Sequence, residues 1–287
     1  MARRTVLVCG VGLMGHGIAQ VMAAAGHDVR VYEPDRARAE AGVARIAGNL
    51  DRSVAKGRLT ADESVAQLGR LAITDLVEGA QDIDLAVEAV FEDEGVKRDL
   101  FARLDAAAPQ SAVLASNTSS ISIARLAEAV SPERRQMIVG MHFFSPVPVM
   151  PLVELIRGAE TSDATEAAVR AISSELGKQV IVSQDRPGFI VNRILMPYLA
   201  EAMRAYEEGL GTAEDIDTGA KVGLNHPMGP LELADFIGLD VCLSIMGVLH
   251  EGLDQEHFAA PAVLRDLVAA GDLGQKTGRG FYAYPRG

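Results

Sequence analysis

Apolar runs rich in β-branched residues alternate with amphipathic stretches through the first part of the chain. The apolar runs predict strands at Val6–Cys9, Val29–Glu33, Leu71–Thr74, Leu85–Glu88, Ala112–Ser116, Met137–Met141, Val153–Ile156 and Val180–Ser183. Helical periodicity between several of these runs predicts helices at Met14–Ala25, Asp35–Ala55, Asp93–Ala106 and Thr165–Leu176. Alternation of this kind is typical of an α/β fold, with a doubly wound, mainly parallel sheet covered by helices.

The connection between the second and third predicted strands, residues 34–70, is unusually long. It has helical periodicity up to Ala55, then a Lys56-Gly57 turn, then a second helical stretch. Thr60 and Glu63 have the spacing of a capping box, in which each side chain accepts a hydrogen bond from the other residue's backbone N–H. We therefore expect a helical hairpin inserted into the sheet domain.

The pattern changes at Pro187-Gly188, after which only helical periodicity is found before the final turn. The sequence thus predicts two domains, residues 1–186 with the sheet and residues 187–287 with helices alone. Further helices are expected around Ala213–Val222, Leu231–Phe236, Val241–His250 and Ala262–Ala269. The first helix after the boundary has a wide apolar face from Phe189 to Met203, which favours burial against a partner subunit and hence a homodimer.

The segment Gly10-Val11-Gly12-Leu13-Met14-Gly15 is a G-x-G-x-x-G motif that follows the first predicted strand and opens the first predicted helix. In that context Gly10 permits the tight turn, Gly12 lets the backbone approach a diphosphate, and Gly15 lets the helix pack closely on the strand. The free N–H groups of the helix start, from Leu13 and Met14 onward, favour bound phosphate. The motif predicts a Rossmann-type dinucleotide site, whereas the alternative is an ordinary strand–turn–helix without a ligand.

Glu33 ends the second predicted strand and specifies the dinucleotide. A carboxylate at this position accepts hydrogen bonds from the ribose hydroxyls of the adenosine half and repels a 2′-phosphate. We therefore expect NAD as the cofactor rather than NADP, and no metal.

His142 and Glu154 are the strongest candidates for proton transfer. His142 ends a predicted strand, at the sheet edge where such folds bind ligands. Glu154 lies within the apolar run 151–156, where a carboxylate needs a partner. A carboxylate beside an imidazole fixes its tautomer and stabilises the imidazolium formed during proton transfer. Spacing alone favours a structural ion pair equally, so both interpretations stay open.

Polar residues after another strand offer a second group of candidates. The segment 116–120, Ser-Asn-Thr-Ser-Ser, follows the strand that ends at Ser116, and its hydroxyls and amide suit a polar substrate. The alternative is a hydrogen-bonded turn that starts the next helix. Asn192 is polar on the mostly apolar first helix of the second domain, where a buried structural amide is the alternative.

Charge and cysteine content exclude several function classes. The 287 residues carry a formal net charge of −12, which disfavours nucleic acid and anionic membrane surfaces as general partners. No apolar run approaches the roughly 18 residues of a membrane span. The two cysteines, Cys9 and Cys242, are too few for a disulfide framework and favour a reducing compartment, so we expect a cytoplasmic protein.

Many motifs, in order along nearly the whole chain, resemble one family, the short, stand-alone L-3-hydroxyacyl-CoA dehydrogenases, and in particular their short-chain 3-hydroxybutyryl-CoA branch. They are Gly10–Gly15, Val87–Val90, Ala115–Ser120, His142–Val149, Leu152–Glu154, Pro187–Arg193, Asn225–Pro230, Gly238–Asp240 and Lys276–Tyr282. The resemblance implies NAD-dependent oxidation of a 3-hydroxyacyl thioester to the 3-ketoacyl thioester, closure of two domains over the substrate, and a dimer formed by the second domain.

The resemblance also implies roles for the polar candidates. His142 takes the proton of the 3-hydroxyl, Glu154 supports His142, and Ser119 and Asn192 bind the reacting oxygen or assist His142.

Further residues would hold the cofactor and the thioester carrier. By the same resemblance, Glu88 and Lys97 lie near the nicotinamide half of NAD and Asn117 lies beside its ribose. Basic residues of the hairpin, including Arg52 and Lys56, meet the phosphates of coenzyme A.

The acyl carrier distinguishes two versions of this activity. The hairpin has fewer lysines than a typical family member, and Ser145 stands where many members have asparagine. The alternative is therefore a dehydrogenase for a hydroxyacyl group on an acyl carrier protein, in the synthesis of polyketide extender units. A dehydrogenase of free hydroxy acids fits the motifs less well, and a retired, NAD-sensing scaffold would have lost His142 or Glu154.

Overall fold

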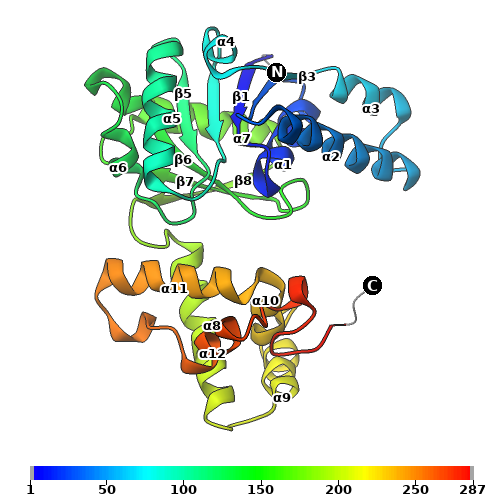
Figure 1. Cartoon of the computed structure of the whole chain (residues 1–287), viewed down its shortest axis with the longest axis vertical. Coiled ribbons are helices and arrows are strands. Elements are labelled where there is room, and N and C mark those ends of the chain that lie inside the picture. The colour runs from blue at the N-terminus through cyan, green and yellow to red at the C-terminus, as the bar shows by residue number, and fades with distance from the viewer. Residues whose placement is uncertain (1–2, 285–287) are drawn as a thin grey trace. The chain divides into compact units, whose positions relative to one another are not determined.

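The computed structural model describes residues 3–284, which form two compact units divided between Arg186 and Pro187 (Figure 1). Residues before the division contain the sheet, and the regular elements after it are all helices or helical turns. The α/β fold class with an all-helical second part is confirmed.

One sheet organises the first unit, with the strand order β3-β2-β1-β4-β5-β6-β7-β8. All neighbours are parallel except β6 and β7, which pair antiparallel. The strands are β1 Thr5–Cys9, β2 Asp28–Tyr32, β3 Leu71–Ile73, β4 Leu85–Glu88, β5 Val113–Ser116, β6 Ile138–Phe143, β7 Leu152–Arg157 and β8 Gln179–Gln184.

Helices connect these strands, and α2 and α3 form the predicted hairpin, which projects past β3 (Figure 1). The helices are α1 Leu13–Ala24, α2 Arg36–Ala55, α3 Ala61–Leu68, α4 Leu76–Ala80, α5 Glu94–Ala107, α6 Ile123–Ala127, the 3₁₀ helix Pro132–Met137 and α7 Asp163–Glu175. The capping box of α3 is confirmed, since the Thr60 N–H donates to Glu63 at 2.8 Å and the Glu63 N–H to Thr60 at 3.2 Å. We did not predict α4, α6 or the 3₁₀ helix, because so few residues show no helical period.

Parallel register brings the ends of the central strands to one edge of the sheet. Cys9, Glu88, Ser116 and Gly140 are successive partners across β1, β4, β5 and β6. β6 continues three residues beyond Gly140, to Phe143. His142 therefore lies inside a strand and not at its end, which corrects the predicted strand Met137–Met141.

Arg134 binds the segment between α5 and β5, near the residues where β5 and β6 begin. Its guanidinium is fully buried and donates to the carbonyls of Ala108, Pro109 and Ala112 and to the Asp105 carboxylate. These carbonyls lie between the end of α5 and the start of β5, where the last carbonyls of a helix have no intrahelical donor, although the Pro109 carbonyl also accepts from the Ala112 N–H. The arginine thus replaces water as their donor.

The second unit is a cluster of helices around one apolar core. Its elements are α8 Val191–Glu207, α9 Ala213–Thr218, the π-helical turn Gly219–Gly223, α10 Pro230–Ile237, α11 Leu239–Leu253, a 3₁₀ turn Glu256–Phe258, α12 Ala262–Ala269 and a 3₁₀ turn Gln275–Thr277. The predicted helix Ala213–Val222 changes at Thr218 from an α-helix to a π-helical turn.

Two buried aspartates tie the last residues of this unit to its helices. Asp217 accepts hydrogen bonds from the N–H groups of Leu231 and Glu232 and from the Tyr282 hydroxyl, at 2.8–2.9 Å. Asp235 accepts from the N–H groups of Phe281 and Tyr282 at 3.0 Å. The pKa of Asp235 is raised, because the effect of burial outweighs the opposite effect of these backbone donors.

No single helix in residues 3–284 has the length and apolarity to cross a membrane. The pair α10 and α11, bent by 97°, meets the length and composition test of a broken span. Both helices contribute buried side chains to the core of the second unit, including Leu231 and Met246.

Arg134→Met should destabilise the first unit strongly. The substitution removes the arginine donor from the carbonyls of Ala108 and Ala112 and leaves Asp105 without its cation, and removing one partner of a buried ion pair costs about 3–5 kcal/mol. Thermal and urea unfolding followed by circular dichroism measures this change. Arg135→Met is the matched control, because its partly exposed pair with Glu160 should contribute no more than about 1 kcal/mol. Equal losses in the two variants would contradict the structural role of Arg134.

Candidate active site

The glycine motif adopts the geometry that a dinucleotide loop requires. Gly10 has φ +91°, and a Cβ there would lie 2.5 Å from the Ala89 carbonyl oxygen. A Cβ on Gly15 would lie 1.8 Å from the carbonyl oxygen of Gly10, so α1 could not approach the strand end with a larger residue. At Gly12 a Cβ would meet nothing within 4 Å, because this residue faces open space. Crowding therefore explains Gly10 and Gly15, whereas no close contact within the protein requires glycine at position 12.

The start of α1 is open to an anion. Gly12 caps the helix without a side-chain hydrogen bond, and the side chain of Leu13 is 71% exposed. The N–H groups at this helix start are therefore not taken by a capping side chain. Glu33 follows β2, and its carboxylate accepts a 3.4 Å hydrogen bond from the Val11 N–H of the same loop. The loop, the helix start and this carboxylate together fit the diphosphate and adenosine ribose of NAD.

A fully buried ion pair lies beside the loop. Lys97 of α5 contacts Glu88, the last residue of β4, with 2.6 Å between Nζ and Oε1. Neither side chain has more than 1% of its surface exposed. The other carboxylate oxygen of Glu88 accepts a 2.5 Å hydrogen bond from the Ser116 hydroxyl. The pair thus joins β4, α5 and β5, and much of each polar group is already engaged within the protein.

Glu92 is a second carboxylate of this network, and the sequence interpretation missed it. Its Oε2 lies 3.0 Å from Lys97 Nζ, while Oε1 accepts hydrogen bonds from the Thr118 and Ser120 hydroxyls and the Ser119 N–H. Burial alone would raise the pKa of Glu92, but the Lys97 charge and the hydrogen bonds outweigh it and the pKa is lowered. An acidic residue four positions after a strand end, with a lysine five residues further on, was the available signal.

His142 and Glu154 are direct partners across the antiparallel strands β6 and β7. Cross-strand partners place their side chains on the same face of a sheet. Their side chains meet with 3.1 Å between Nδ1 and Oε2, and Glu154 is completely buried. The Phe144 ring packs against His142 with 4.6 Å between ring centroids. Contact through Nδ1 turns Nε2 away from Glu154, as a supported general base requires.

The structure brings most predicted residues of the first unit to one sheet edge. Ser119 lies on the loop after β5 and is half-buried. Asn117, on the same loop, accepts a 2.9 Å hydrogen bond from the Phe143 N–H next to His142. Arg52 and Lys56 lie elsewhere, exposed near the end of α2, where Arg52 donates to Asn49. Asn192 is buried on α8 of the second unit.

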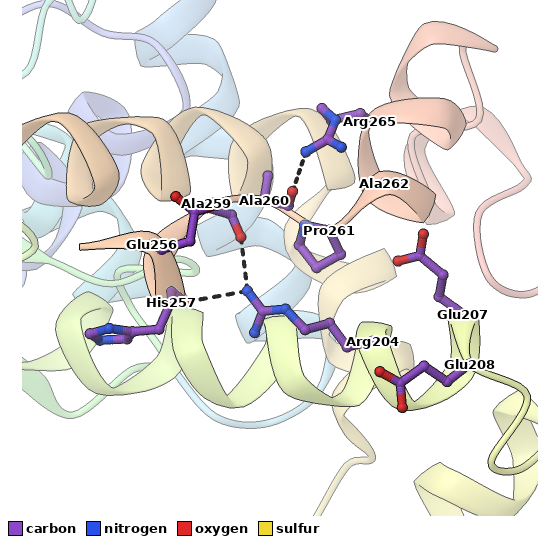
Figure 2. A pocket seen from close by; sticks show the side chains of 10 residues that line it. All are labelled: Arg204, Glu207, Glu208, Glu256, His257, Ala259, Ala260, Pro261, Ala262 and Arg265. Carbon is purple, nitrogen blue, oxygen red and sulfur yellow. Dashed lines mark hydrogen bonds between the residues drawn. The ribbon is translucent and has the colours of Figure 1, made fainter. Parts of the chain in front are cut away.

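A surface cavity of about 530 Å³ lies in the second unit, away from the predicted residues (Figure 2). Charged side chains of both signs line it, among them Arg204, Glu207 and Arg265. The guanidinium of Arg204 is turned to the carbonyls of His257 and Ala259, and that of Arg265 to Ala260 (Figure 2). None of the lining residues is one that the sequence assigned to the cofactor or to proton transfer.

Comparison with known proteins identifies the class. Residues 5–186 match the family model described as 3-hydroxyacyl-CoA dehydrogenase, NAD binding domain, and residues 188–284 match 3-hydroxyacyl-CoA dehydrogenase, C-terminal domain. The chain is therefore an NAD-dependent oxidoreductase. It belongs to the 3-hydroxyacyl-CoA dehydrogenase family, and the predicted family and cofactor are confirmed.

Individual relatives extend this match over the whole chain. A 3-hydroxybutyryl-CoA dehydrogenase of Bradyrhizobium diazoefficiens is 50% identical, with 98% of this chain and 95% of the relative covered. One of Mycobacterium tuberculosis is 46% identical, with 99% of each covered. The crystal structure of the (S)-3-hydroxybutyryl-CoA dehydrogenase of Ralstonia eutropha is 44% identical and superposes with a TM-score of 0.95, with 99% of this chain and 100% of that one covered.

Glu92→Gln should change how stability depends on pH. A carboxylate with a lowered pKa stabilises the folded state above its ordinary value of 4.5, and this contribution is lost as pH falls through the lower folded value. The variant should therefore melt at a lower temperature than the parent near pH 7. The difference should shrink below about pH 4.5, which thermal melts between pH 7 and 3 would measure. A constant difference across that range would contradict the role of the ionised carboxylate.

Proposed function

We propose that the chain oxidises the L-3-hydroxyacyl group of a short-chain coenzyme A thioester to the 3-ketoacyl thioester, reversibly, with 3-hydroxybutyryl-CoA as substrate. The observation that carries this proposal is the His142–Glu154 contact at the same sheet edge as the glycine loop. High identity to relatives named 3-hydroxybutyryl-CoA dehydrogenase over nearly their full length supports the substrate.

His142 is the general base in this proposal. Its Nε2 takes the proton of the 3-hydroxyl as the carbinol carbon is oxidised, and gives that proton back in the reverse reduction. Glu154 holds Nδ1 in the protonated tautomer and stabilises the imidazolium, because its carboxylate has no exposed surface where water could screen the charge. Bound NAD supplies the redox chemistry by accepting the hydride that leaves the carbinol carbon.

Other residues bind and orient in the same proposal. The N–H groups at the start of α1, including those of Leu13 and Met14, hold the diphosphate, and Glu33 holds the adenosine ribose. The Glu88–Lys97–Glu92 network fixes the loop that carries Ser119, whose hydroxyl binds the reacting oxygen. Asn192 of the second unit is proposed to contribute to the same oxygen site.

The carrier of the acyl group is proposed to be coenzyme A. Arg52 and Lys56 give the exposed end of α2 positive charge suited to phosphates. The names of the relatives support coenzyme A, and nothing in them supports the acyl-carrier-protein alternative. We further propose that the second unit forms a homodimer and that the enzyme works in the cytoplasm, in keeping with its two buried, free cysteines.

Loss of NADH absorbance at 340 nm with acetoacetyl-CoA tests the proposed activity. We expect turnover with the coenzyme A ester and little with the same acyl group on an acyl carrier protein. Turnover of the carrier-bound substrate alone would replace the proposal by the alternative, and turnover of neither would reject both.

His142→Ala should lower kcat about 10²–10⁴-fold, the range of general acid–base contributions, with NADH affinity nearly unchanged. Stopped-flow turnover and NADH fluorescence titration measure the two quantities. His257→Ala is the control, because His257 is an exposed residue of the second unit and should be dispensable. Parent-like kcat in His142→Ala would remove His142 from the mechanism.

A further inference from the structure

β6 extends beyond the strand that supports it. Its pairing with β5 ends at Ser116 and Gly140, yet β6 itself continues to Phe143. His142 lies in this extension, where it is the cross-strand partner of Glu154 in β7. Beyond Gly140 the ladder between β5 and β6 does not continue, so the Phe143 N–H has no acceptor in β5.

The side chain of Asn117 supplies one acceptor at this point. Its Oδ1 accepts the Phe143 N–H at 2.9 Å, and its own N–H donates to the Glu88 carbonyl at 2.8 Å. Phe143 is 1% exposed, so water is not an easy substitute for this acceptor. A buried N–H without a partner costs about 1–3 kcal/mol. The Asn117 side chain therefore stabilises β6 in its observed position, and this stabilisation is lost when the side chain is removed.

The same residue lies two positions before Ser119. Beyond Asn117, the Ser119 N–H is held by Glu92 at 3.1 Å. The loop is therefore anchored to β6 through Asn117 and to the buried carboxylate network through Glu92. This arrangement sets the separation of His142 and Ser119, which must reach one oxygen atom in the proposed function.

We propose that Asn117 is a positioning residue, whose side-chain carbonyl replaces the missing ladder acceptor and fixes His142 relative to the Ser119 loop. This inference rests on the proposed function of His142 and Ser119. It differs from the cofactor role that the family resemblance implies for Asn117, because its carbonyl oxygen is engaged by the backbone of β6. A ribose ligand would change NADH affinity, whereas a positioning residue would change turnover at saturating cofactor.

Asn117→Ala and Asn117→Asp separate the two roles. Misplacement of a catalytic group by about 1 Å costs up to about 10²-fold in rate, so the alanine variant should lose about 10- to 100-fold in kcat. Its dissociation constant for NADH should stay within about twofold of the parent, since no cofactor contact is removed. The aspartate variant should recover most of kcat, because a carboxylate oxygen accepts the same N–H.

Hydrogen exchange of the Phe143 amide reports its hydrogen bond to the Asn117 side chain, independently of turnover. In protein labelled with ¹⁵N-phenylalanine, we expect this amide to exchange faster in the alanine variant and to stay protected in the aspartate variant. Thr161→Val is the matched control, because Thr161 also binds β6 by its side chain, donating to the Ile138 carbonyl at 2.6 Å at the other end of the strand. It should lower the melting temperature without changing kcat.

Each outcome decides the proposal. Unchanged kcat in Asn117→Ala, or weaker NADH binding with parent-like kcat, overturns it, and the second result would make Asn117 a cofactor ligand. Equal loss in the alanine and aspartate variants also overturns it. If the parent enzyme does not turn over acetoacetyl-CoA, the proposed function fails separately. Unchanged exchange of the Phe143 amide in the alanine variant then rejects the positioning role of Asn117.

Discussion

The carboxylate of Glu88, buried at the end of a central strand, is the constraint on which the site depends. A buried charge must be paired and hydrogen-bonded, because desolvation otherwise costs several kcal/mol or more. Lys97 and the Ser116 hydroxyl meet that need, and each comes from a different element. The pair therefore locks α5 and β5 to β4, and Lys97 in turn holds Glu92. Removing either partner would leave the other charged in the sheet, so the network holds the loop after β5 in one arrangement.

A change of strand direction creates the other half of the site. β7 runs antiparallel to β6, which places Glu154 opposite His142 at a spacing that only the turn between these strands determines. Lys178 holds that turn by donating to the carbonyls of Val147 and Met150, at 2.6 and 2.7 Å. Burial lowers the pKa of this lysine, which has backbone carbonyls in place of a carboxylate partner. The turn in turn packs on α1, where a Cβ on Gly17 would lie 2.9 Å from Val147 Cβ. The turn between β6 and β7 therefore contacts α1, which follows the glycine loop, and also joins the two strands that carry His142 and Glu154.

Buried carboxylates also organise the second unit, but their hydrogen-bond partners are different. Asp217 and Asp235 are buried and accept hydrogen bonds from backbone N–H groups and tyrosine hydroxyls rather than from cations. Glycines make room for them, because a Cβ on Gly229 would lie 2.2 Å from Asp217 Cγ and one on Gly280 would lie 2.0 Å from Asp235 Oδ1. The motifs Asn225–Pro230 and Lys276–Tyr282, recognisable in the sequence as family features, have this structural reason: each places a glycine against a buried carboxylate.

The sequence by itself determined the features that depend on neighbouring residues. Apolar, β-branched runs and period-3.6 patterns located the long elements, the Thr60–Glu63 spacing located a helix start, and the glycine motif with Glu33 specified NAD. Short helices such as α4 were not predicted, because a helix of about one turn is too short to show helical periodicity. The contacts between distant residues were decided only by the tertiary structure. Spacing could not distinguish His142 and Glu154 from a simple ion pair, and it revealed neither Glu92 nor the hydrogen bond from the Phe143 N–H to Asn117. Sheet register and the length of β6 past β5 fix these contacts, and both arise from packing between segments far apart in the chain.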